Sequence, residues 1–573
     1  MRERFIPAFL SISFAVLLIA LFYNQAVMFN YYSTLSKNNA IRIVPIDGPR
    51  GQVFDRNGIR LVSNRLAFDV AVIHRELRSE GELTDFLAKT LGASRQDVER
   101  SLAKARTRPY EPVTIVEDID KDKALLLEES TIYMPGLEIK TRSRRHYLYG
   151  DIGSHVFGYL SEVTESELEQ LEEYGYRQKD LIGRSGIEKS YESRLRGVDG
   201  ATLIQVDSKA RQVRTLGMKE PSSGEDLYLS IDMRLEALCD KMLKERRGAI
   251  VVMDPQNGQI LALSSGPTFD PNVFVKSKGS AERLRLMKDL KGRPLSNRAT
   301  SNSYEPGSVF KVVIASGALE TKKISVNTHF SCPGSYTLGR TRFDCWKEGG
   351  HGSQDVKDAL KNSCNVFFYQ TGRALGVDNI ETYAKLLGFG KACGIDLPDE
   401  VSGLVPGRMW KRFYKKDNWY EGETVNYAIG QGYLLVTPLQ ILNMMAAVSN
   451  GGKLVKPHLA VRIGSSNITQ TAPRNINLKE RTLKEVKTGL FNVVNAEHGT
   501  GGRAKVEGIS IAGKTGTAQN PRGPTHAWFS GFAPFDNPRI CLVVFLEHGG
   551  KGGLEPAEMA KGIFEEAKRL GYL

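Results

Sequence analysis

The first long hydrophobic segment of the chain runs from Phe5 to Tyr23 and contains no charged residue. As a helix rising roughly 1.5 Å per residue, it nearly spans the hydrocarbon core of a membrane. The following residues, FYNQAVMFNYY, offer no small-x-small cleavage site of the kind that ends a secretory signal peptide. The pattern therefore predicts an uncleaved membrane anchor at residues 5–24.

The flanks of this segment predict its orientation. Arg2 and Arg4 precede it, and the next charge is Lys37. By the positive-inside rule, residues 1–4 form a cytoplasmic tail, and everything after the anchor lies outside the membrane. A polar stalk is expected at residues 25–44. The sequence has no second long apolar run, which predicts a single-pass protein.

Residues 45–222 mix strand-like and helix-like patterns. GQVFDRNGIRLVSN reads as two short strands around a turn, and ATLIQVDSKARQVRTL again alternates between apolar and polar positions. ELTDFLAKTLGASRQDVERSLAKAR has apolar residues at helical spacing and predicts a helix pair. This region gathers no candidate nucleophiles or metal ligands, so we expect a structural role for it.

Residues 223–573 are predicted to form a second domain, after a Pro-, Ser- and Gly-rich linker, KEPSSGED. GAIVVMDPQNGQILALSS predicts a hairpin, helical segments follow, and three strand-like runs appear late: VEGISIAGKTGTAQ, AWFSGFAPF and RICLVVFLEH. An amphipathic segment, EPAEMAKGIFEEAKRL, predicts a last helix. The order favours an α+β fold in which both ends of the domain build one antiparallel sheet flanked by helices.

Length and charge limit the number of folded units and the kinds of partner only slightly. A chain of 573 residues predicts two or three folded units. The formal net charge is +13, but acidic and basic residues are interleaved, and we find no basic tract or RNA-binding signature. Dispersed basic surface therefore explains the charge, and no nucleic-acid partner is expected.

Three short motifs carry candidate chemistry. Ser308 and Lys311 lie three residues apart near the start of a predicted helix, so both project from one face, and the lysine is placed to accept the serine proton. Ser363 and Asn365 form a Ser-x-Asn element. Lys514, Thr515, Gly516 and Thr517 follow an alternating strand, where a backbone edge can pair with an extended peptide.

Each motif also occurs in a context that predicts no catalysis. Ser101 and Lys104 repeat the first spacing in a charged amphipathic helix. Ser465-Ser466-Asn467 repeats the second in a polar loop, and Lys487-Thr488-Gly489 repeats the third in a helical pattern. Context, rather than the letters alone, therefore selects Ser308, Ser363 and Lys514.

In this order, the three motifs resemble the active-site elements of penicillin-binding proteins and class A β-lactamases. RGQVFDRNG and GRSGIEKSYESRLRG resemble the N-terminal pedestal motifs of class B penicillin-binding proteins, and NRATSNSYEPGS and IGQGYLLVTPLQ resemble their transpeptidase core. WKEGGHG and WYEGETVNYAIGQGY most resemble the elongation branch. The resemblance spans essentially all residues from 45 on, so it implies a dimerisation-like pedestal at 45–222 and a transpeptidase domain at 223–573.

The resemblance also implies a reaction and a role for each residue. Ser308 would attack a stem peptide that ends in D-Ala-D-Ala, Lys311 would take its proton, and Ser363 would relay a proton to the leaving amine. Asn365 would hold a substrate amide, Lys514 would add positive potential, and Gly516 belongs to the same substrate-binding strand. Thr515 and Thr517 would bind the terminal carboxylate or its β-lactam counterpart, and the backbone N–H groups of Ser308 and Thr517 would form the oxyanion hole. No cofactor is expected for catalysis.

The resemblance further implies the surroundings of the reaction. The donor is a peptidoglycan stem peptide, the acceptor is a neighbouring amine, and β-lactams acylate the same serine. Glycan polymerisation would fall to a SEDS-family glycosyltransferase in the inner (cytoplasmic) membrane, with the catalytic domain on the periplasmic face. The alternatives are a division-type transpeptidase, a non-enzymatic membrane β-lactam sensor, and a β-lactamase that uses Glu423 and Asn426 for deacylation.

Four further residues suggest a metal site beside the second motif. Cys332, Cys345, His351 and Cys364 provide three thiols and an imidazole, which is ligand chemistry for structural zinc. The segment between them is glycine-rich and poor in apolar residues, so metal ligation could supply its order. A Cys332–Cys345 disulfide or a structural His351 remains an alternative. The other three cysteines are isolated, and Cys541 reads as a buried hydrophobe.

Overall fold

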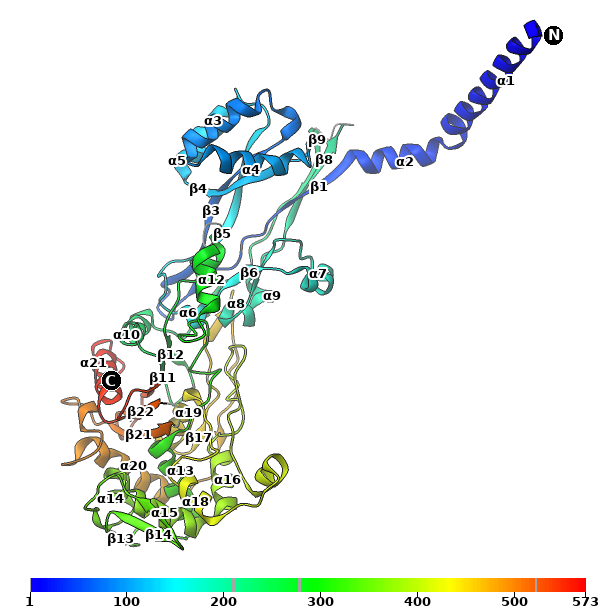
Figure 1. Cartoon of the computed structure of the whole chain (residues 1–573). Helices are drawn as coiled ribbons and strands as arrows, with labels where there is room; N and C mark the ends of the chain where they lie inside the picture. The colour runs from blue at the N-terminus through cyan, green and yellow to red at the C-terminus, as the bar shows by residue number, and fades with distance from the viewer. Residues whose placement is uncertain (1, 208–211, 277–279, 521–522) are drawn as a thin grey trace. The chain divides into compact units, whose positions relative to one another are not determined.

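The computed structural model describes residues 2–207, 212–276, 280–520 and 523–573, and Figure 1 shows the course of the chain. The chain divides into two units, each assembled from several segments. The first contains residues 1–50, 64–144 and 196–224, and the second contains residues 51–63, 145–195 and 225–573.

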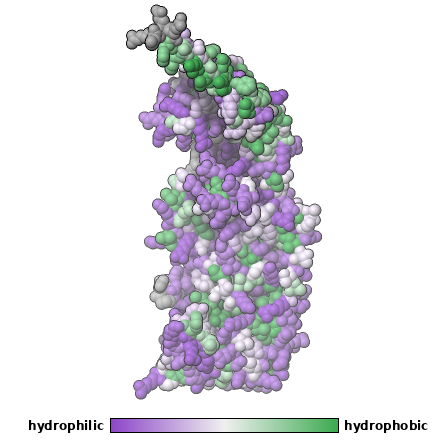
Figure 2. Space-filling view, turned by 90° about the vertical axis from the view of Figure 1, so that its right-hand side faces the viewer, coloured by the Kyte–Doolittle hydropathy of each residue, from purple (hydrophilic) through white to green (hydrophobic). Residues whose placement is uncertain are grey.

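The N-terminal residues of the first unit form a long apolar helix. Helix α1 (Arg2–Phe22) continues through a π-helical turn, η1 (Tyr23–Val27), into α2 (Phe29–Ala40). Residues Phe5–Val27 are long and apolar enough to cross a membrane, and none of this stretch is buried. Figure 2 shows its surface as a green, hydrophobic stretch beside the grey N-terminal residues. This finding agrees with a single-pass membrane anchor.

The rest of the first unit contains a sheet of strands β1, β8 and β9 and a small α+β body. Strand β8 lies between β1 and β9 and is antiparallel to both. The predicted helix pair is present: α3 begins at the Ser79 cap and ends at Gly92, which has a positive φ of 68°, and α4 begins at the Ser94 cap. The bounds are β1 (Ile41–Ile46), β3 (Arg60–Val72), η2 (His74–Glu76), α3 (Glu80–Leu91), α4 (Arg95–Arg106), β4 (Val113–Ile119), α5 (Lys121–Ser130), β5 (Leu137–Tyr147), β8 (Gly200–Val206) and β9 (Gln212–Lys219).

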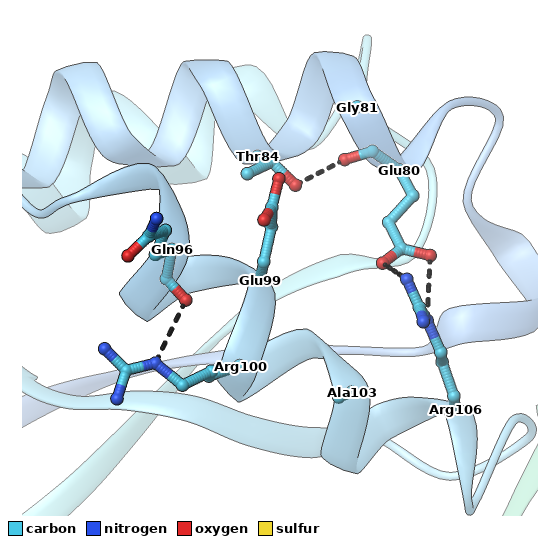
Figure 3. Close-up of a pocket in the computed structure, with 8 residues that line it drawn as sticks. All are labelled: Glu80, Gly81, Thr84, Gln96, Glu99, Arg100, Ala103 and Arg106. Atoms are coloured by element: carbon cyan, nitrogen blue, oxygen red, sulfur yellow. Dashed lines mark hydrogen bonds and ion pairs between the residues drawn. The ribbon is translucent and has the colours of Figure 1, made fainter.

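A shallow hollow of about 660 Å³ lies between α3 and α4, and Figure 3 shows its lining. Two of its charged groups pair with each other. Arg106 pairs with Glu80 at 2.6 Å, and the Thr84 hydroxyl donates to the Glu80 carbonyl at 2.7 Å. No candidate catalytic residue is among the lining residues.

The second unit is built around a five-stranded antiparallel sheet in the order β12-β11-β23-β22-β21. The predicted hairpin supplies β11 and β12, and the three late strands complete the sheet, as the sequence pattern indicated. Gly248 at the start of β11 lies opposite Leu546 at the end of β23. The strands are β11 (Gly248–Met253), β12 (Ile260–Gly266), β21 (Ala512–Asn520), β22 (Gly523–Ala533) and β23 (Ile540–Leu546).

Helices cover both faces of this sheet. On one face, α10 (Met233–Leu243) and α21 (Glu555–Arg569) share an apolar core with the strands. On the other, α13 (Lys311–Glu320) and α19 (Pro438–Ser449) belong to a larger core, and α19 is buried along its whole length. Because α19 is capped by Thr437 and Gln440 in a reciprocal box with Pro438 in its first turn, its start is fixed. The α+β fold predicted from sequence is confirmed.

Strand β21 is the edge of the five-stranded sheet, with β22 on one side only among the described strands. The remaining elements of this unit range from two-residue strands to the 16-residue helix α20. They are β2 (Val53–Phe54), α6 (Ser154–Phe157), β6 (Leu160–Glu162), α7 (Glu165–Leu171), η3 (Glu172–Tyr174), β7 (Leu181–Gly183), α8 (Gly186–Ser190), α9 (Glu192–Leu195), β10 (Leu227–Leu229), α11 (Asn272–Val275), α12 (Ser280–Lys288), η4 (Gly307–Phe310), β13 (Phe330–Cys332), β14 (Ser335–Leu338), β15 (Thr341–Asp344), β16 (Gly352–Gln354), α14 (Val356–Lys361), α15 (Asn365–Leu375), α16 (Val377–Leu386), α17 (Arg408–Trp410), η5 (Lys411–Lys415), α18 (Glu421–Tyr427), β17 (Lys453–Leu454), β18 (Ala460–Ile463), β19 (Ser466–Asn467), β20 (Arg474–Asn475), α20 (Glu480–Asn495) and η6 (Gly502–Ala504).

Candidate functional site

The three predicted motifs converge at one place in the second unit. Ser308 lies in the 3₁₀ turn η4, which leads directly into α13, and Lys311 is the first residue of that helix. Ser363 immediately precedes the Cys364 cap of α15, and Lys514 lies on the edge strand β21. Four separate elements therefore supply the site.

Ser363 joins the two lysines. Its hydroxyl accepts from the Lys514 ammonium at 3.0 Å and lies 3.3 Å from that of Lys311. Lys311 also donates to the Ser363 carbonyl at 2.8 Å and to the Asn365 side-chain oxygen at 2.7 Å. Both lysines are fully buried, whereas Ser308 is partly open to solvent. The two lysines and the Ser363 hydroxyl therefore form a buried hydrogen-bonded group, while Ser308 is accessible to solvent.

Burial changes the protonation of both lysines. It lowers the pKa of Lys311 to about 8, although the field of the Cys364 and Cys345 sulfur atoms opposes the shift. It also depresses the pKa of Lys514 well below its ordinary value, and the neighbouring Lys311 charge adds to that effect. Two ammonium groups sharing one hydroxyl repel each other, so the site favours a state in which one lysine is neutral. A neutral lysine is the form that can accept a serine proton.

The backbone around Ser308 is packed tightly against β21. A Cβ atom on Gly307 would lie 2.6 Å from the Thr517 carbonyl oxygen, and one on Gly516 would lie 2.8 Å from a Val309 methyl group. Gly307 also has φ +54°, a region that favours glycine. Glycine is therefore required on both sides of this contact, which brings the chain beside Ser308 next to that of Thr517.

Ser363 itself has φ +50°, which is uncommon for a residue with a side chain. Two donors bind the backbone at this residue. The Lys311 ammonium donates to the Ser363 carbonyl, and the Trp346 indole N–H donates to the same carbonyl at 3.2 Å and to that of Asn362 at 3.0 Å. The sequence analysis did not identify this role of Trp346. The only feature of the sequence that pointed to this residue was its position next to Cys345.

The two threonines predicted to bind substrate, Thr515 and Thr517, differ in their surroundings. The Thr515 hydroxyl donates to the Thr500 hydroxyl at 3.1 Å, a partner that the motifs did not reveal. Thr517 is exposed, and its hydroxyl accepts from the Gly552 N–H at 3.4 Å. Both side chains come from the edge strand, beside the sheet edge where an extended peptide can pair.

The repeated motifs do not join the site. Ser101 and Lys104 lie in α4 of the first unit, and Lys487-Thr488-Gly489 lies within α20. The expectation of a polar loop at Ser465-Ser466-Asn467 is wrong at its last two residues, which pair with β18 as the two-residue strand β19. The pairing is local, because a short hairpin satisfies backbone groups that a loop would leave to water.

The four predicted metal ligands also come together. The ligand atoms of Cys332, Cys345, His351 and Cys364 all lie within 4.8 Å of one another. The His351 Nδ1 atom lies 3.6 Å from the Cys332 sulfur and 3.5 Å from that of Cys345. A tetrahedral zinc ion with ordinary bond lengths separates nitrogen and sulfur ligands by about 3.6 Å, so these residues fit the metal. All six cysteines are free thiols, and the alternative Cys332–Cys345 disulfide is absent from the described residues.

Comparisons with known proteins give the family. Residues 248–565 match the penicillin binding protein transpeptidase domain, and residues 45–229 match the penicillin-binding protein dimerisation domain. The chain belongs to the class B penicillin-binding proteins. The peptidoglycan D,D-transpeptidase MrdA of Acinetobacter baumannii is 34% identical over 95% of this chain and 84% of its own length.

Solved structures of class B penicillin-binding proteins share the fold. The complex between a penicillin-binding protein (PBP2) and MreC from Helicobacter pylori matches with a TM-score of 0.81 and 29% identity, covering 93% of this chain and 100% of that one. A structure titled "Structural coordination of polymerization and crosslinking by a peptidoglycan synthase complex" matches with a TM-score of 0.77 and 29% identity, covering 98% and 97%. The resemblance inferred from sequence, including its PBP2 branch, is confirmed.

Proposed function

We propose that this chain is an elongation-type peptidoglycan D,D-transpeptidase in which Ser308 forms the acyl-enzyme. The Ser308 oxygen attacks the carbonyl carbon of the penultimate D-Ala, while neutral Lys311 takes the hydroxyl proton. The bond to the terminal D-Ala nitrogen breaks, and Ser363 passes a proton to that amine. An amine of a neighbouring strand then attacks the ester, forms the new amide and returns a proton toward Ser308.

One observation carries this proposal: a single hydroxyl, that of Ser363, contacts two buried lysines that come from different motifs. Such an arrangement has little structural benefit, because burying two like charges is costly unless one is neutral. The close packing of Gly307 against Thr517 supports an oxyanion hole made from the backbone N–H groups of Ser308 and Thr517. Asn365, Thr515 and Thr517 are the proposed contacts for the donor peptide.

Labelled penicillin tests the nucleophile. It should attach covalently to the wild-type protein and to Ser101→Ala, which changes the repeated motif in α4, and it should not attach to Ser308→Ala. Full labelling of Ser308→Ala, or a labelled peptide that contains Ser101, would contradict the proposal.

A β-lactamase needs a carboxylate that activates water for deacylation. Glu423 was the candidate, but its side chain pairs with the buried Lys411 ammonium at 2.7 Å and accepts from the Tyr420 N–H at 2.8 Å. A carboxylate held in this way is poorly suited to act as a free base. The anchor and the dimerisation domain also favour a transpeptidase over a secreted lactamase.

We further propose that the catalytic unit lies on the periplasmic side of the inner membrane. The arginines before the anchor, Arg2 and Arg4, support this orientation. A SEDS-family glycosyltransferase is the proposed partner for glycan polymerisation, and the complex of polymerisation and crosslinking among the related structures supports it. β-Lactams are the proposed inhibitors, since they mimic the D-Ala-D-Ala end.

Structural zinc is proposed at Cys332, Cys345, His351 and Cys364. The distances from His351 to two sulfur atoms support the assignment, and three of the four residues are buried. With four protein ligands the site would be closed, which suits a structural metal rather than a catalytic one. The ion would tie the β13–β16 loop to the start of α15, and therefore to Ser363 and Asn365.

Elemental analysis of protein purified without added metal tests this assignment. We expect about one zinc per chain, as a closed four-ligand site binds one ion. Metal-free protein with all four side chains unmodified would contradict it, and so would a Cys332–Cys345 crosslink in the peptide map.

A further inference from the structure

A group of aromatic and basic side chains lies on α17, on η5 and at Lys416, and all but the half-buried Trp410 are exposed to solvent. We call it the aromatic-basic patch and define it as Trp410, Arg412, Phe413, Tyr414, Lys415 and Lys416. Phe413 and Tyr414 are 67% and 68% exposed, which is unusual for two adjacent rings on a soluble domain. The proposed mechanism uses none of these residues.

The patch has a rigid base. The Lys411 ammonium is buried beneath it and donates to the Asn418 carbonyl at 2.6 Å, while Asp417 and Glu423 accept from it at 2.8 Å and 2.7 Å. A buried cation with three acceptors fixes the turn that carries the exposed rings. The side chains above it are therefore presented in a defined arrangement, which lowers the entropy cost of binding a ligand.

The patch carries positive charge that the protein itself does not neutralise. Lys415 lies over the rings of Trp410 and Tyr433, at 6.0 Å and 5.5 Å from their centroids, and Lys416 lies 5.3 Å from that of Phe413. No carboxylate pairs with Arg412, Lys415 or Lys416 within the described ranges, because the nearby Asp417 and Glu423 pair with the buried Lys411 instead. Ring faces bordered by unpaired cations suit a ligand that is both anionic and rich in C–H surface.

The patch is connected to the wall of the active site. The rings of Trp410 and Tyr433 are 5.2 Å apart, and Tyr433 follows the Gly430 turn by three residues. The Gly430 carbonyl accepts from the N–H of Gly307, the neighbour of the nucleophile, at 3.0 Å. A long polymer bound at Ser308 can therefore continue over these rings.

We propose that the aromatic-basic patch binds a peptidoglycan glycan strand, with sugar faces on the rings and stem-peptide carboxylates on Arg412, Lys415 and Lys416. This proposal rests on the proposed transpeptidase function and adds a binding site for the polymer to it. The continuity with Ser308 favours the strand over an anionic lipid surface, the other ligand that a basic aromatic patch attracts. Binding energy from the remote strand would then hold the reacting peptide in place.

The test is co-sedimentation of the full detergent-solubilised chain with purified peptidoglycan sacculi over a range of salt concentrations. A triple variant should bind sacculi about tenfold more weakly and with a flatter salt dependence; it carries Arg412→Gln, Lys415→Gln and Lys416→Gln. This loss of affinity is the size expected for three exposed charge pairs. Phe413→Ala with Tyr414→Ala should weaken binding but keep the salt dependence. The matched control removes three exposed cations elsewhere in the unit, through Lys391→Gln, Arg481→Gln and Lys484→Gln. It should bind sacculi like wild type.

Penicillin carries no glycan strand, so its acylation rate separates this proposal from the one on Ser308. Failure of the wild type to be acylated would refute the transpeptidase, whatever the sacculus result. The proposal that the patch binds glycan would be wrong if the triple variant bound sacculi as well as wild type does. It would also be wrong if the control variant lost as much sacculus binding as the triple variant. Two further outcomes would also contradict the proposal. One is that the triple variant is acylated by penicillin more slowly than wild type as well as binding sacculi less. The other is that the triple variant binds sacculi normally but no longer binds phosphatidylglycerol vesicles, which would identify a lipid surface as the ligand.

Discussion

At the scale of single residues, the site depends on which lysine is neutral. Lys311 and Lys514 are both buried, and each donates to Ser363. A hydroxyl between two lysines can accept from one and donate to the other as the proton moves. In the proposed mechanism, the same pair would provide both the base for acylation and the acid for amine departure.

Acylation should rise with pH through the pKa of Lys311, which burial lowers to about 8. Below that pH the ammonium cannot accept the Ser308 proton, so the rate should fall about tenfold per pH unit and should level off above it. Stopped-flow acylation by a fluorescent penicillin measures the profile. Lys104→Ala, at the repeated motif in α4, should leave it unchanged. A flat profile across this range would show that Lys311 is not the base.

Replacing Trp346 with Phe should slow acylation about five- to tenfold, since one lost hydrogen bond is worth ~1 kcal/mol. The indole N–H holds the carbonyl of Ser363, whose φ is positive, so its loss should loosen the relay while metal content stays the same. Trp419→Phe removes a comparable bond, to the Thr424 hydroxyl at 2.8 Å, and is the control. Equal rates for the two variants would deny Trp346 a positioning role.

At the scale of elements, the sequence predicted best those helices and strands whose apolar spacing repeats over many residues. The five-stranded sheet, the helix pair α3–α4 and the final helix α21 follow directly from apolar spacing. The short pairs β13–β16 and β14–β15 could not be predicted, because their strands are three or four residues long and only partly buried. Their order comes from contacts with residues that are distant in sequence.

The candidate site was also predicted only in part. The motifs pointed to Ser308, Lys311, Ser363 and Lys514, but they did not indicate how the backbone of Ser363 is held. Its left-handed backbone depends on Trp346, which a single sequence cannot connect to it. Thr500 escaped notice because one hydroxyl partner in a loop has no spacing signal.

Cys364→Ser should lose the proposed zinc, because serine is a poor ligand at a thiolate site. We expect Tm to fall by at least about 5 °C, since a structural zinc contributes several kcal/mol. Acylation should also slow even though Ser363 is intact. Calorimetry and elemental analysis measure the first two effects. Cys393→Ser, outside the cluster, is the control, and a variant that keeps its metal would count against the ligand assignment.

The helix α1 should remain in the mature protein. The apolar stretch Phe5–Val27, which runs from α1 into η1, lacks a cleavage site, and none of it is buried, as expected for a membrane-spanning helix. Intact-mass measurement of protein extracted from membranes should include it. A mature N-terminus beyond residue 27 would identify a signal peptide, and the soluble form made by deleting residues 2–27 provides the mass standard.

At the scale of the whole molecule, the elongation assignment predicts where the protein works. A fluorescent fusion should lie along the side wall of a rod-shaped cell, and depletion should cause rounding rather than filaments. The Ser308→Ala fusion is the control, because it should reach the same place without restoring shape. Accumulation at midcell would instead indicate a division enzyme.

The pairing of β11 with β23 has a consequence for how the protein is made. Gly248 near the beginning of the catalytic unit lies opposite Leu546 close to its end, and β21 with Lys514 joins the sheet only through β22 and β23. Such distant pairing forms late and slowly. The sheet that carries Lys514 therefore cannot be completed until nearly all of the chain has been synthesised. Interrupted synthesis leaves an inert membrane fragment rather than an enzyme that cross-links in the wrong place.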